Sequence, residues 1–122
     1  MTPFGAKLRQ LRQERGIEQK AMAAALGVSA SYLSALEHGR RGKPTWATVQ
    51  KVIGFFNVIW DDAEELQRLA QLSDPRVVVD TAELAPEATA FANHLAARIR
   101  KLTPQQIAAM QAVLDGPAKA KP

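Results

Sequence analysis

Residues 18–39 read EQKAMAAALGVSASYLSALEHG, and this stretch predicts two short helices joined by a tight turn. Met22 and Leu26 fall at helical spacing, so the first helix has an apolar face. Gly27 follows at the position where a chain that leaves a helix adopts a positive φ. Ser29 can then cap the second helix, because its hydroxyl can accept a hydrogen bond from a free backbone N–H. The stretch therefore specifies two helices at a fixed angle.

The contact between these two helices requires a small residue. Ala23 supplies it, since helices that cross steeply over a short turn leave room for little more than a methyl group. Val28 is an apolar plug in the turn, and Leu33 and Leu36 give the second helix its inward face. This order of residues is typical of a helix-turn-helix, which presents its second helix to the major groove of DNA.

Several spaced positions extend the pattern beyond the two helices. They are Leu8, Arg9, Leu11, Arg12, Arg15 and Gly16 before the motif, Gln19 at its start, and Leu36, Glu37 and Gly39 at its end. With the turn at residues 27–29, they resemble the lambda-repressor-like, XRE-type helix-turn-helix family over residues 3–72. The resemblance implies an all-α, five-helix DNA-binding domain. It also implies an ion pair between Arg12 and Glu37, whereas the alternative is that both are solvated surface charges.

The basic residues of the chain are unevenly distributed. The formal net charge is +4, yet the first 43 residues hold eight basic and three acidic residues, whereas residues 44–122 hold eight basic and nine acidic ones. The excess of cations thus coincides with the helix-turn-helix, as a polyanion-binding protein requires. The simpler alternative is a solvated basic face.

Composition argues against several classes of protein. The chain of 122 residues has no cysteine, so it has no disulfide or thiol metal site and fits a reducing cytoplasm. No apolar run approaches the ~20 residues that span a bilayer, and the N-terminus lacks the basic-then-apolar pattern of a signal peptide. We expect a cytoplasmic, nucleoid-associated protein with no membrane partner.

The apolar pattern predicts five helices within residues 1–73. Thr45 can cap the fourth helix, and Asn57 can end it in a left-handed conformation. A capping box of Asp61 and Glu64 would start the fifth. The aromatic residues of this region fit packing in a core or an interface better than a ligand cage: they are Trp46, Phe55, Phe56 and Trp60.

A change of pattern at Ser73-Asp74-Pro75 separates this domain from the rest of the chain. Residues 74–85 form a linker, in which the β-branched stretch 76–80 suggests an extended segment. Residues 86–115 form a C-terminal helical segment, and residues 116–122 are expected to be a disordered tail.

The segment 86–115 is predicted to form two helices. Pro86 starts the first, and a further capping box of Thr103 and Gln106 starts the second. Apolar side chains step along one side of both helices at intervals of three and four: Ala88, Phe91, Leu95, Ile99, Leu102, Ile107, Met110 and Leu114. Two helices alone cannot bury both stripes, so they fold back on the first domain or pair with a second copy. We favour a homodimer, because two copies can bind half-sites about one DNA turn apart.

The candidate DNA contacts lie on both helices of the motif and in the basic loop behind them. They are Gln19, Lys20, Ser29, Ala30, Ser31, Tyr32, Ser34, Ala35, His38, Arg40, Arg41 and Lys43. The cations, with Gln19 and Tyr32, would contact phosphates and supply most of the affinity. Modest specificity would come from Ser31, Ser34 and His38 and from DNA shape. His38 is equally well explained as a plain surface residue.

The family resemblance assigns base contacts to Ala30, Ser31 and Ala35. Relatives carry Gln or Arg at such positions, whereas an alanine can offer only a methyl contact to thymine. Strong direct readout of sequence is therefore not expected from these three positions.

An enzyme is not expected. The chain has only two histidines, His38 and His94, no glycine-rich phosphate loop, and no paired histidines for a metal. The carboxylates near the fifth helix fit charges at a helix start: Asp61, Asp62, Glu64 and Glu65. We predict no metal and no cofactor, and the sequence indicates no site for a small-molecule ligand.

The favoured interpretation is a sequence-specific, double-stranded DNA-binding transcriptional regulator, with repression preferred over activation. One rival is a helix-turn-helix adaptor or antitoxin-like protein whose tail binds a protein partner, and the alanines at readout positions favour it mildly. Gln19 and the loop cations favour DNA. A low-specificity DNA-organising protein is a third alternative.

Overall fold

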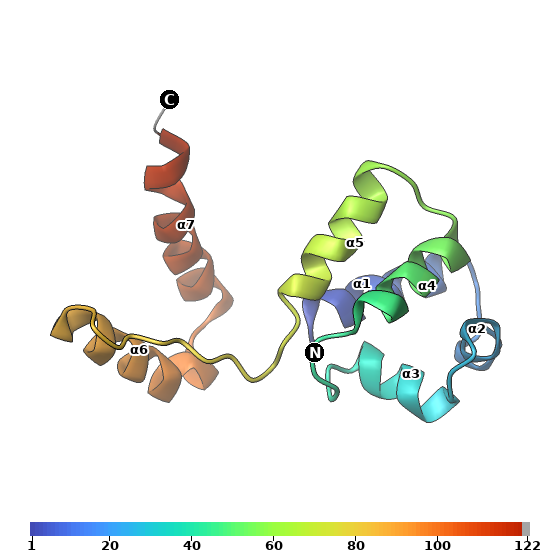
Figure 1. The fold of residues 1–122 in the computed structure, drawn as a ribbon, viewed down its shortest axis with the longest axis horizontal. Coiled ribbons are helices and arrows are strands. Elements are labelled where there is room, and N and C mark those ends of the chain that lie inside the picture. The colour runs from blue at the N-terminus through green and yellow to red at the C-terminus, as the bar shows by residue number, and fades with distance from the viewer. Residues whose placement is uncertain (121–122) are drawn as a thin grey trace. The chain divides into compact units, whose positions relative to one another are not determined.

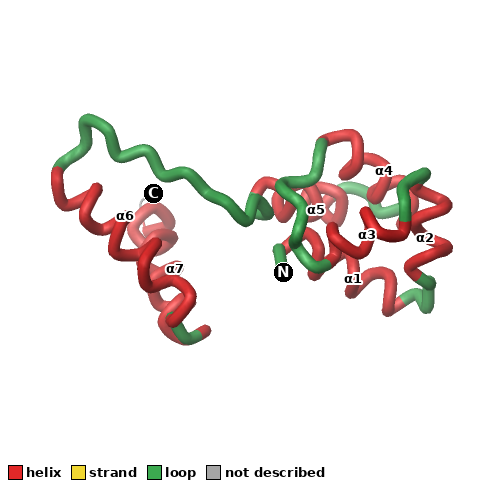
Figure 2. Tube along the Cα trace, turned by 90° about the horizontal axis from the view of Figure 1, so that it is seen from below, coloured by secondary structure: helices red, strands yellow, loops and turns green. Residues whose placement is uncertain are grey.

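The computed structural model describes residues 1–120, and the side chains of residues 1–116. The chain forms two compact units, Met1–Val77 and Val78–Pro122. All regular secondary structure within the described residues is helical, as Figures 1 and 2 show, and the all-α prediction is confirmed.

The first unit contains five helices: α1 (Pro3–Glu14), α2 (Gln19–Leu26), α3 (Ala30–Glu37), α4 (Trp46–Phe56) and α5 (Asp61–Gln71). The hydroxyls of Thr2, Ser29 and Thr45 accept hydrogen bonds from backbone N–H groups at the starts of α1, α3 and α4, at 3.1, 3.0 and 3.1 Å. Asn57 ends α4 with φ of 54°, in the left-handed conformation that the sequence predicted.

One apolar core holds the five helices together. Its fully buried members come from every helix of the unit: Phe4, Leu8, Met22, Leu33, Val52, Phe56 and Leu66. Ser73 closes the domain, because its buried hydroxyl accepts from the N–H of Phe4 at 2.9 Å and donates to the carbonyl of Leu69 at 2.6 Å. The residue at which the helical pattern breaks thus joins the end of α5 to the start of α1.

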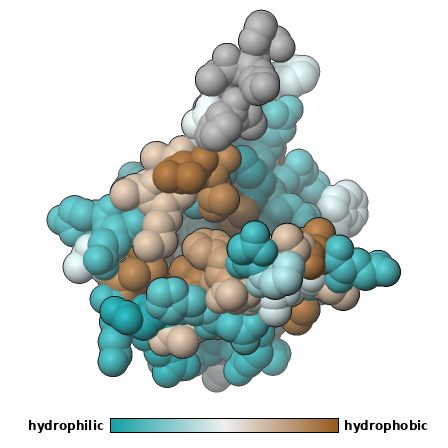
Figure 3. Space-filling model, turned by 90° about the vertical axis from the view of Figure 1, so that its left-hand side faces the viewer, coloured by the Kyte–Doolittle hydropathy of each residue, from teal (hydrophilic) through white to brown (hydrophobic). Residues whose placement is uncertain are grey.

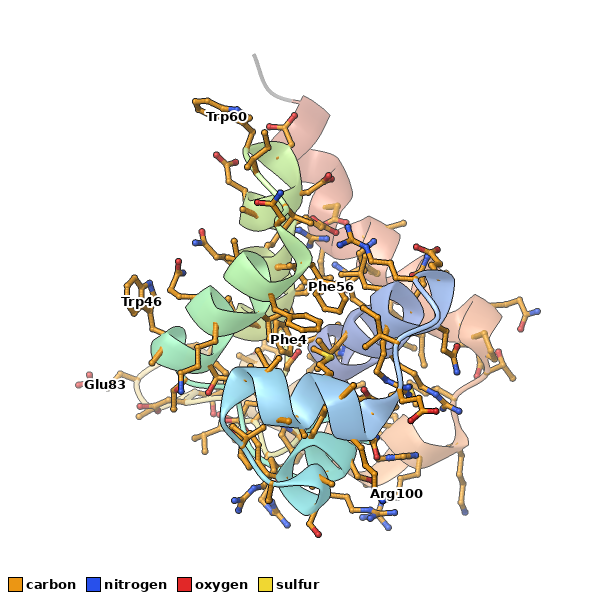
Figure 4. All side chains as sticks on the ribbon, turned by 90° about the vertical axis from the view of Figure 1, so that its right-hand side faces the viewer. Phe4, Trp46, Phe56, Trp60, Glu83 and Arg100 are labelled. Carbon is orange, nitrogen blue, oxygen red and sulfur yellow. The ribbon has the colours of Figure 1, made fainter. Side chains whose placement is uncertain are left out.

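Two aromatic residues that were predicted to pack are exposed. Trp46 and Trp60 expose 75% and 81% of their surface and point outward in Figure 4, so the core alternative is wrong for both, and a position in an interface stays a prediction. Each lies at the start of a helix, Trp46 as the first residue of α4 and Trp60 as the residue before α5. Phe56 is buried as expected, and Phe55 packs edge-on against it with ring centroids 5.0 Å apart.

The capping box predicted for α5 does not form. Asp61 is already the first helical residue, and Trp60 occupies the cap position with φ of 53° and no side-chain cap bond. A carboxylate inside the helix cannot serve as its cap. Asp61, Asp62 and Glu64 instead place negative charge in the first turn, where the helix dipole favours it.

The second unit contains α6 (Pro86–Arg98), the short 3₁₀ helix η1 (Ile99–Lys101) and α7 (Pro104–Ala120). The predicted box at the start of α7 is present: the N–H of Thr103 donates to Oε1 of Gln106 at 2.9 Å, and the N–H of Gln106 donates to Oγ1 of Thr103 at 3.1 Å. No residue of α6 or η1 is buried. The unit therefore lacks a core of the kind that the first unit has.

Helix α7 continues past Asp115, where the sequence placed the end of the helical segment, and reaches Ala120. Ala118 and Ala120 in this stretch favour a helix, whereas Gly116 and Pro117 disfavour one, so helix propensity alone does not explain the extension. The last two residues of the predicted disordered tail, 121–122, lie outside the described residues. Across the part of the chain that is described, no helix is long and apolar enough to cross a membrane.

Gly5 of α1 lies directly against the end of α3. A Cβ at this position would come within 2.7 Å of the carbonyl oxygen of Glu37 and still closer to that of Leu36. Both neighbours are backbone atoms, so no side-chain rotation can relieve the clash. The absence of a side chain at Gly5 therefore sets how closely α1 and α3 approach.

We predict that Gly5→Ala destabilises the domain by about 1–3 kcal/mol, because it overpacks this backbone contact. Gly54→Ala is the matched control, since Gly54 is also helical but a Cβ there meets nothing within 4 Å. It should stabilise α4 by roughly 0.5–1 kcal/mol. Urea unfolding of the variants measures both changes. Equal effects of the two substitutions would contradict the close approach at Gly5.

Candidate nucleic-acid interface

The turn at Gly27 fixes the direction in which α3 leaves α2. Gly27 has φ of 72° and ψ of 31°, and the N–H of Val28 donates to the carbonyl of Ala23 at 3.0 Å. A Cβ on Gly27 would meet nothing within 4 Å, so a larger side chain would fit in the space. Glycine is favoured here because the backbone is left-handed. Ala23 is 3% exposed, in agreement with its predicted role as a small buried residue.

Helix α3 has a buried and an exposed side. Leu33, Leu36 and Glu37 are buried, so the helix is held from within. Four of the predicted contact residues on or next to α3 are exposed, Ser29, Ala30, Ser31 and His38, whereas Tyr32, Ser34 and Ala35 are half-buried. The structure thus leaves the predicted readout positions of α3 accessible.

Arg12 and Glu37 form the ion pair that the family resemblance implied. The Nε of Arg12 donates to Oε2 of Glu37 at 2.8 Å, and its Nη2 donates to Oε1 at 3.1 Å. The Nη1 of Arg12 donates to the carbonyl of Ile17 at 3.0 Å. Glu37 is 1% exposed, so a buried, two-pronged ion pair joins α1 to the end of α3.

Gln19, the first residue of α2, belongs to the same network. Its Nε2 donates to Oε1 of Glu37 at 3.2 Å. A carboxylate only accepts hydrogen bonds, so this contact fixes which end of the amide faces Glu37. The same nitrogen carries a second N–H, which this bond does not use. One carboxylate thereby holds side chains from α1 and α2.

The loop after α3 carries its cations close to the helix. The guanidinium of Arg41 lies over the ring of Tyr32, 5.0 Å from the centroid, which is a cation–π contact. Arg40, Arg41 and Lys20 are exposed. Arg41 and Tyr32 therefore place a cation and a phenol hydroxyl next to each other at the first turn of α3.

Lys43 does not extend freely into solvent. Its Nζ donates to Oε1 of Gln71 at 3.1 Å, so the end of the basic loop contacts the last turn of α5. Lys43 and Gln71 also line an open hollow between the start of α4 and α5, beside Trp46 and Ala70.

His38 contacts its own helix. Its Nδ1 lies 2.8 Å from the carbonyl oxygen of Ser34, and because a carbonyl only accepts, Nδ1 carries the proton. Nε2 is the ring nitrogen that remains for an external partner. His94 lies on α6 of the second unit, where it lines a hollow with Phe91 and Met110.

Sequence reasoning missed the contacts that orient the candidate residues. The pairs Gln19–Glu37, Tyr32–Arg41 and Lys43–Gln71 join residues 18, 9 and 28 positions apart, and no helical spacing signals them. Among the described residues, no group of three His, Asp or Glu side chains is placed to hold a metal ion.

Comparison with known proteins identifies the first unit. A family model described as a helix-turn-helix domain matches residues 3–69, which is more than half of the chain. These findings define a helix-turn-helix protein. The chain belongs to this helix-turn-helix family, in agreement with the class of protein that its resemblance to lambda-repressor-like, XRE-type regulators implied.

Several relatives of this chain are named as regulators of transcription. The chain is 36% identical over 62 residues to the uncharacterized HTH-type transcriptional regulator RghRB of Bacillus subtilis (strain 168), covering 51% of this chain and 45% of that protein. It is 44% identical over 52 residues to the HTH-type transcriptional repressor RghR of the same strain, covering 43% and 38%. The chain therefore spans less than half the length of these relatives.

A third relative and one solved structure also match this chain. The HTH-type transcriptional regulator DdrOP3 of Deinococcus deserti is 41% identical over 59 residues, covering 48% of this chain and 45% of that protein. A chain from a complex of the SinR and SinI proteins matches 80% of this chain and 98% of its own length, with 22% identity and a TM-score of 0.43.

We predict that Arg12→Met alone lowers the free energy of unfolding by roughly 3 kcal/mol, because it leaves Glu37 as a buried charge without its cation. Glu37→Met alone should cost less, because the partly buried Arg12 keeps its hydrogen bond to the carbonyl of Ile17. The double variant Arg12→Met/Glu37→Met should recover most of the loss caused by Arg12→Met, since an apolar pair can replace a buried ion pair. Urea unfolding of the three variants tests the coupling. Additive losses in the double variant would show that the two side chains act independently.

Proposed function

We propose that this chain is a sequence-specific, double-stranded DNA-binding transcriptional regulator that acts as a homodimer. The observation that carries the proposal is the presentation of α3: its inner side chains are fixed in the core, while Ala30, Ser31 and His38 stay exposed. A helix held in this way fits the width of the major groove. The name of one relative, a transcriptional repressor, favours repression.

Phosphate contacts would supply most of the affinity. Exposed Lys20, Arg40 and Arg41 are long cations on or next to the motif, and Arg41 brings the Tyr32 hydroxyl into the same group. Gln19 would donate the second N–H of its Nε2, which is not bonded to Glu37, to a phosphate oxygen. Lys43 would have to exchange Gln71 for a phosphate oxygen, which is the stronger acceptor because it is charged.

Base recognition would be modest. Ser31, Ser34 and the free Nε2 of His38 offer polar atoms, while Ala30 and Ala35 offer methyl groups to thymine. Ser29 would act from the start of α3, where its hydroxyl holds the first turn through the N–H of Tyr32 at 3.0 Å. DNA shape would supply the remaining discrimination. Such a role also implies a cytoplasmic, nucleoid-associated location.

The homodimer would form through the second unit. Its helices surround a groove of about 310 Å³ whose lining is almost wholly apolar and includes Phe91, Leu95, Leu102, Ile107 and Met110. Phe91 exposes 61% of its surface, and Val113 and Leu114 expose 71% and 72%. Figure 3 shows hydrophobic side chains on the face that presents this unit. Pairing of two such units would cover apolar surface that one copy leaves in water.

Selection from a random duplex library, followed by gel-shift titration at two salt concentrations, tests DNA binding. The proposal predicts an enriched sequence, a lower Kd for it than for unselected duplex, and weaker binding at the higher salt. No shift at low salt would favour the protein-binding adaptor. Equal Kd values for all duplexes would favour the low-specificity DNA-organising protein.

Arg40→Ala and Arg41→Ala should each weaken binding to selected and unselected duplexes alike. Each should also reduce the slope of log Kd against log salt by about 1, because one phosphate contact and its released counterion are lost. Arg68→Ala is the control, since Arg68 lies on α5 and pairs with Glu65 at 2.9 Å. An unchanged slope for both loop variants would remove this loop from the interface.

Ile107→Glu should shift the chain from dimer to monomer in sedimentation equilibrium, because it puts a charge into the apolar groove of the second unit. Ala112→Glu adds the same charge to α7, at an exposed residue that does not line the groove. This control should leave the dimer unchanged. Equal effects of the two substitutions, or a monomeric parent protein, would rule out pairing through this groove.

A further inference from the structure

The linker contains a short apolar segment with no partner. Residues 76–80 read Arg-Val-Val-Val-Asp, and Val77, Val78 and Val79 expose 73%, 90% and 65% of their surface. Figure 2 draws this part of the chain as an open loop between α5 and α6. Three consecutive β-branched residues favour an extended backbone over a helix, and such residues are seldom left in water together.

The backbone of this segment is also unpaired. Within the described residues, no hydrogen bond is made by the backbone N–H or carbonyl groups of Val77, Val78 and Val79. None of these residues has a positive φ, so each can adopt an extended backbone. The N–H of Arg76, at the end of the segment, donates to Oδ1 of Asp74 at 2.9 Å. A row of free N–H and carbonyl groups that carries β-branched side chains is a template for another strand.

The order of the five residues makes the segment complementary to itself. In an antiparallel pair centred on Val78, Val78 faces Val78 of a second copy, Val77 faces Val79, and Arg76 faces Asp80. Because side chains alternate along a strand, Arg76, Val78 and Asp80 share one face, and Val77 and Val79 share the other. The two copies would thus form two ion pairs on one face and a cluster of four valines on the opposite face.

Other alignments lose this match. A parallel pair would place Arg76 opposite Arg76 and Asp80 opposite Asp80, and like charges directly opposite each other are destabilising. A shift by one residue in the antiparallel pair would face Arg76 with Val79 and separate both ion pairs. Asp80 accepts from the N–H of Ala82 at 2.9 Å through Oδ1, so Oδ2 is available for Arg76 of the other copy.

We propose that residues 76–80 of two copies pair as an antiparallel β-ribbon centred on Val78. The partner that pairs with this exposed segment is therefore a second copy of this chain. A two-stranded ribbon of this length is marginal on its own in water. It becomes favourable once another contact holds the copies together, because the pairing is then effectively intramolecular. The inference rests on the homodimer of the proposed function and adds a second interface to it.

Site-directed disulfides test the register, and the natural chain has no cysteine that could interfere. In the proposed ribbon the two copies of residue 78 are directly opposite, at a Cα separation of about 4.5–5.5 Å that a disulfide can span. Two copies of residue 77, or of residue 79, are diagonal neighbours at roughly 7–8 Å, which exceeds the usual limit of a disulfide.

Full-length Val78→Cys should therefore oxidise to a covalent dimer at least about tenfold faster than Val77→Cys or Val79→Cys alone. An equimolar mixture of Val77→Cys and Val79→Cys should recover fast cross-linking, because these positions face each other between copies. Equal rates for the three variants, or no cross-linking in a protein that sediments as a dimer, would overturn the ribbon and leave the homodimer standing. A monomer in sedimentation would overturn both, whereas the gel shift tests DNA binding separately.

Charge exchange gives an independent readout. Arg76→Asp and Asp80→Arg each create two like-charge pairs, so each should weaken the dimer by about tenfold in sedimentation equilibrium. The double variant Arg76→Asp/Asp80→Arg restores opposite charges in the same register and should recover most of the affinity. Both side chains are exposed, so the core of the first unit is not disturbed. A double variant as weak as the single ones would count against the ribbon.

Discussion

The buried carboxylate of Glu37 is the interaction on which the arrangement of the first three helices depends. Glu37 lies at the end of α3, receives two hydrogen bonds from Arg12 of α1, and accepts a third from Gln19 at the start of α2. A carboxylate that is 1% exposed is tolerated only when it is paired and hydrogen-bonded in this way. Nearby, Gly5 lets the backbone of α1 approach α3, so a polar network and a close steric contact fix the same junction.

The two units solve the problem of burying apolar surface differently. In the first, five helices meet around residues such as Phe4, Leu33 and Phe56, which are at most 1% exposed. In the second, no residue of α6 or η1 is buried, although apolar side chains recur at intervals of three and four along its helices. An amphipathic helix needs another surface to cover its apolar face. Five helices can cover one another's apolar faces, whereas two helices leave part of theirs exposed.

Local signals in the sequence predicted much of the fold, because their causes are local. Gly27 adopts the left-handed conformation, Ser29 and Thr45 cap their helices, and Asn57 ends α4. The failures concern the first residue of α5, which is shifted by one position, and the exposure of two tryptophans, which depends on what surrounds them in space. Asp61 became a helical residue instead of a cap, and Trp46 and Trp60 fell at helix starts that face solvent. The candidate site follows the same rule: exposure of α3 was predictable from Leu33 and Leu36, whereas the contact of Lys43 with Gln71 was not.

The division of α3 into a buried inner side and an exposed outer side would separate folding from the proposed recognition of DNA. Leu33, Leu36 and Glu37 anchor the helix, while Ala30 and Ser31 are exposed and contribute little to the core. Exchanging side chains at those two outer positions should cost the protein little stability. If α3 reads DNA as proposed, substitutions at these exposed positions during evolution would change the preferred DNA sequence while the domain stays folded.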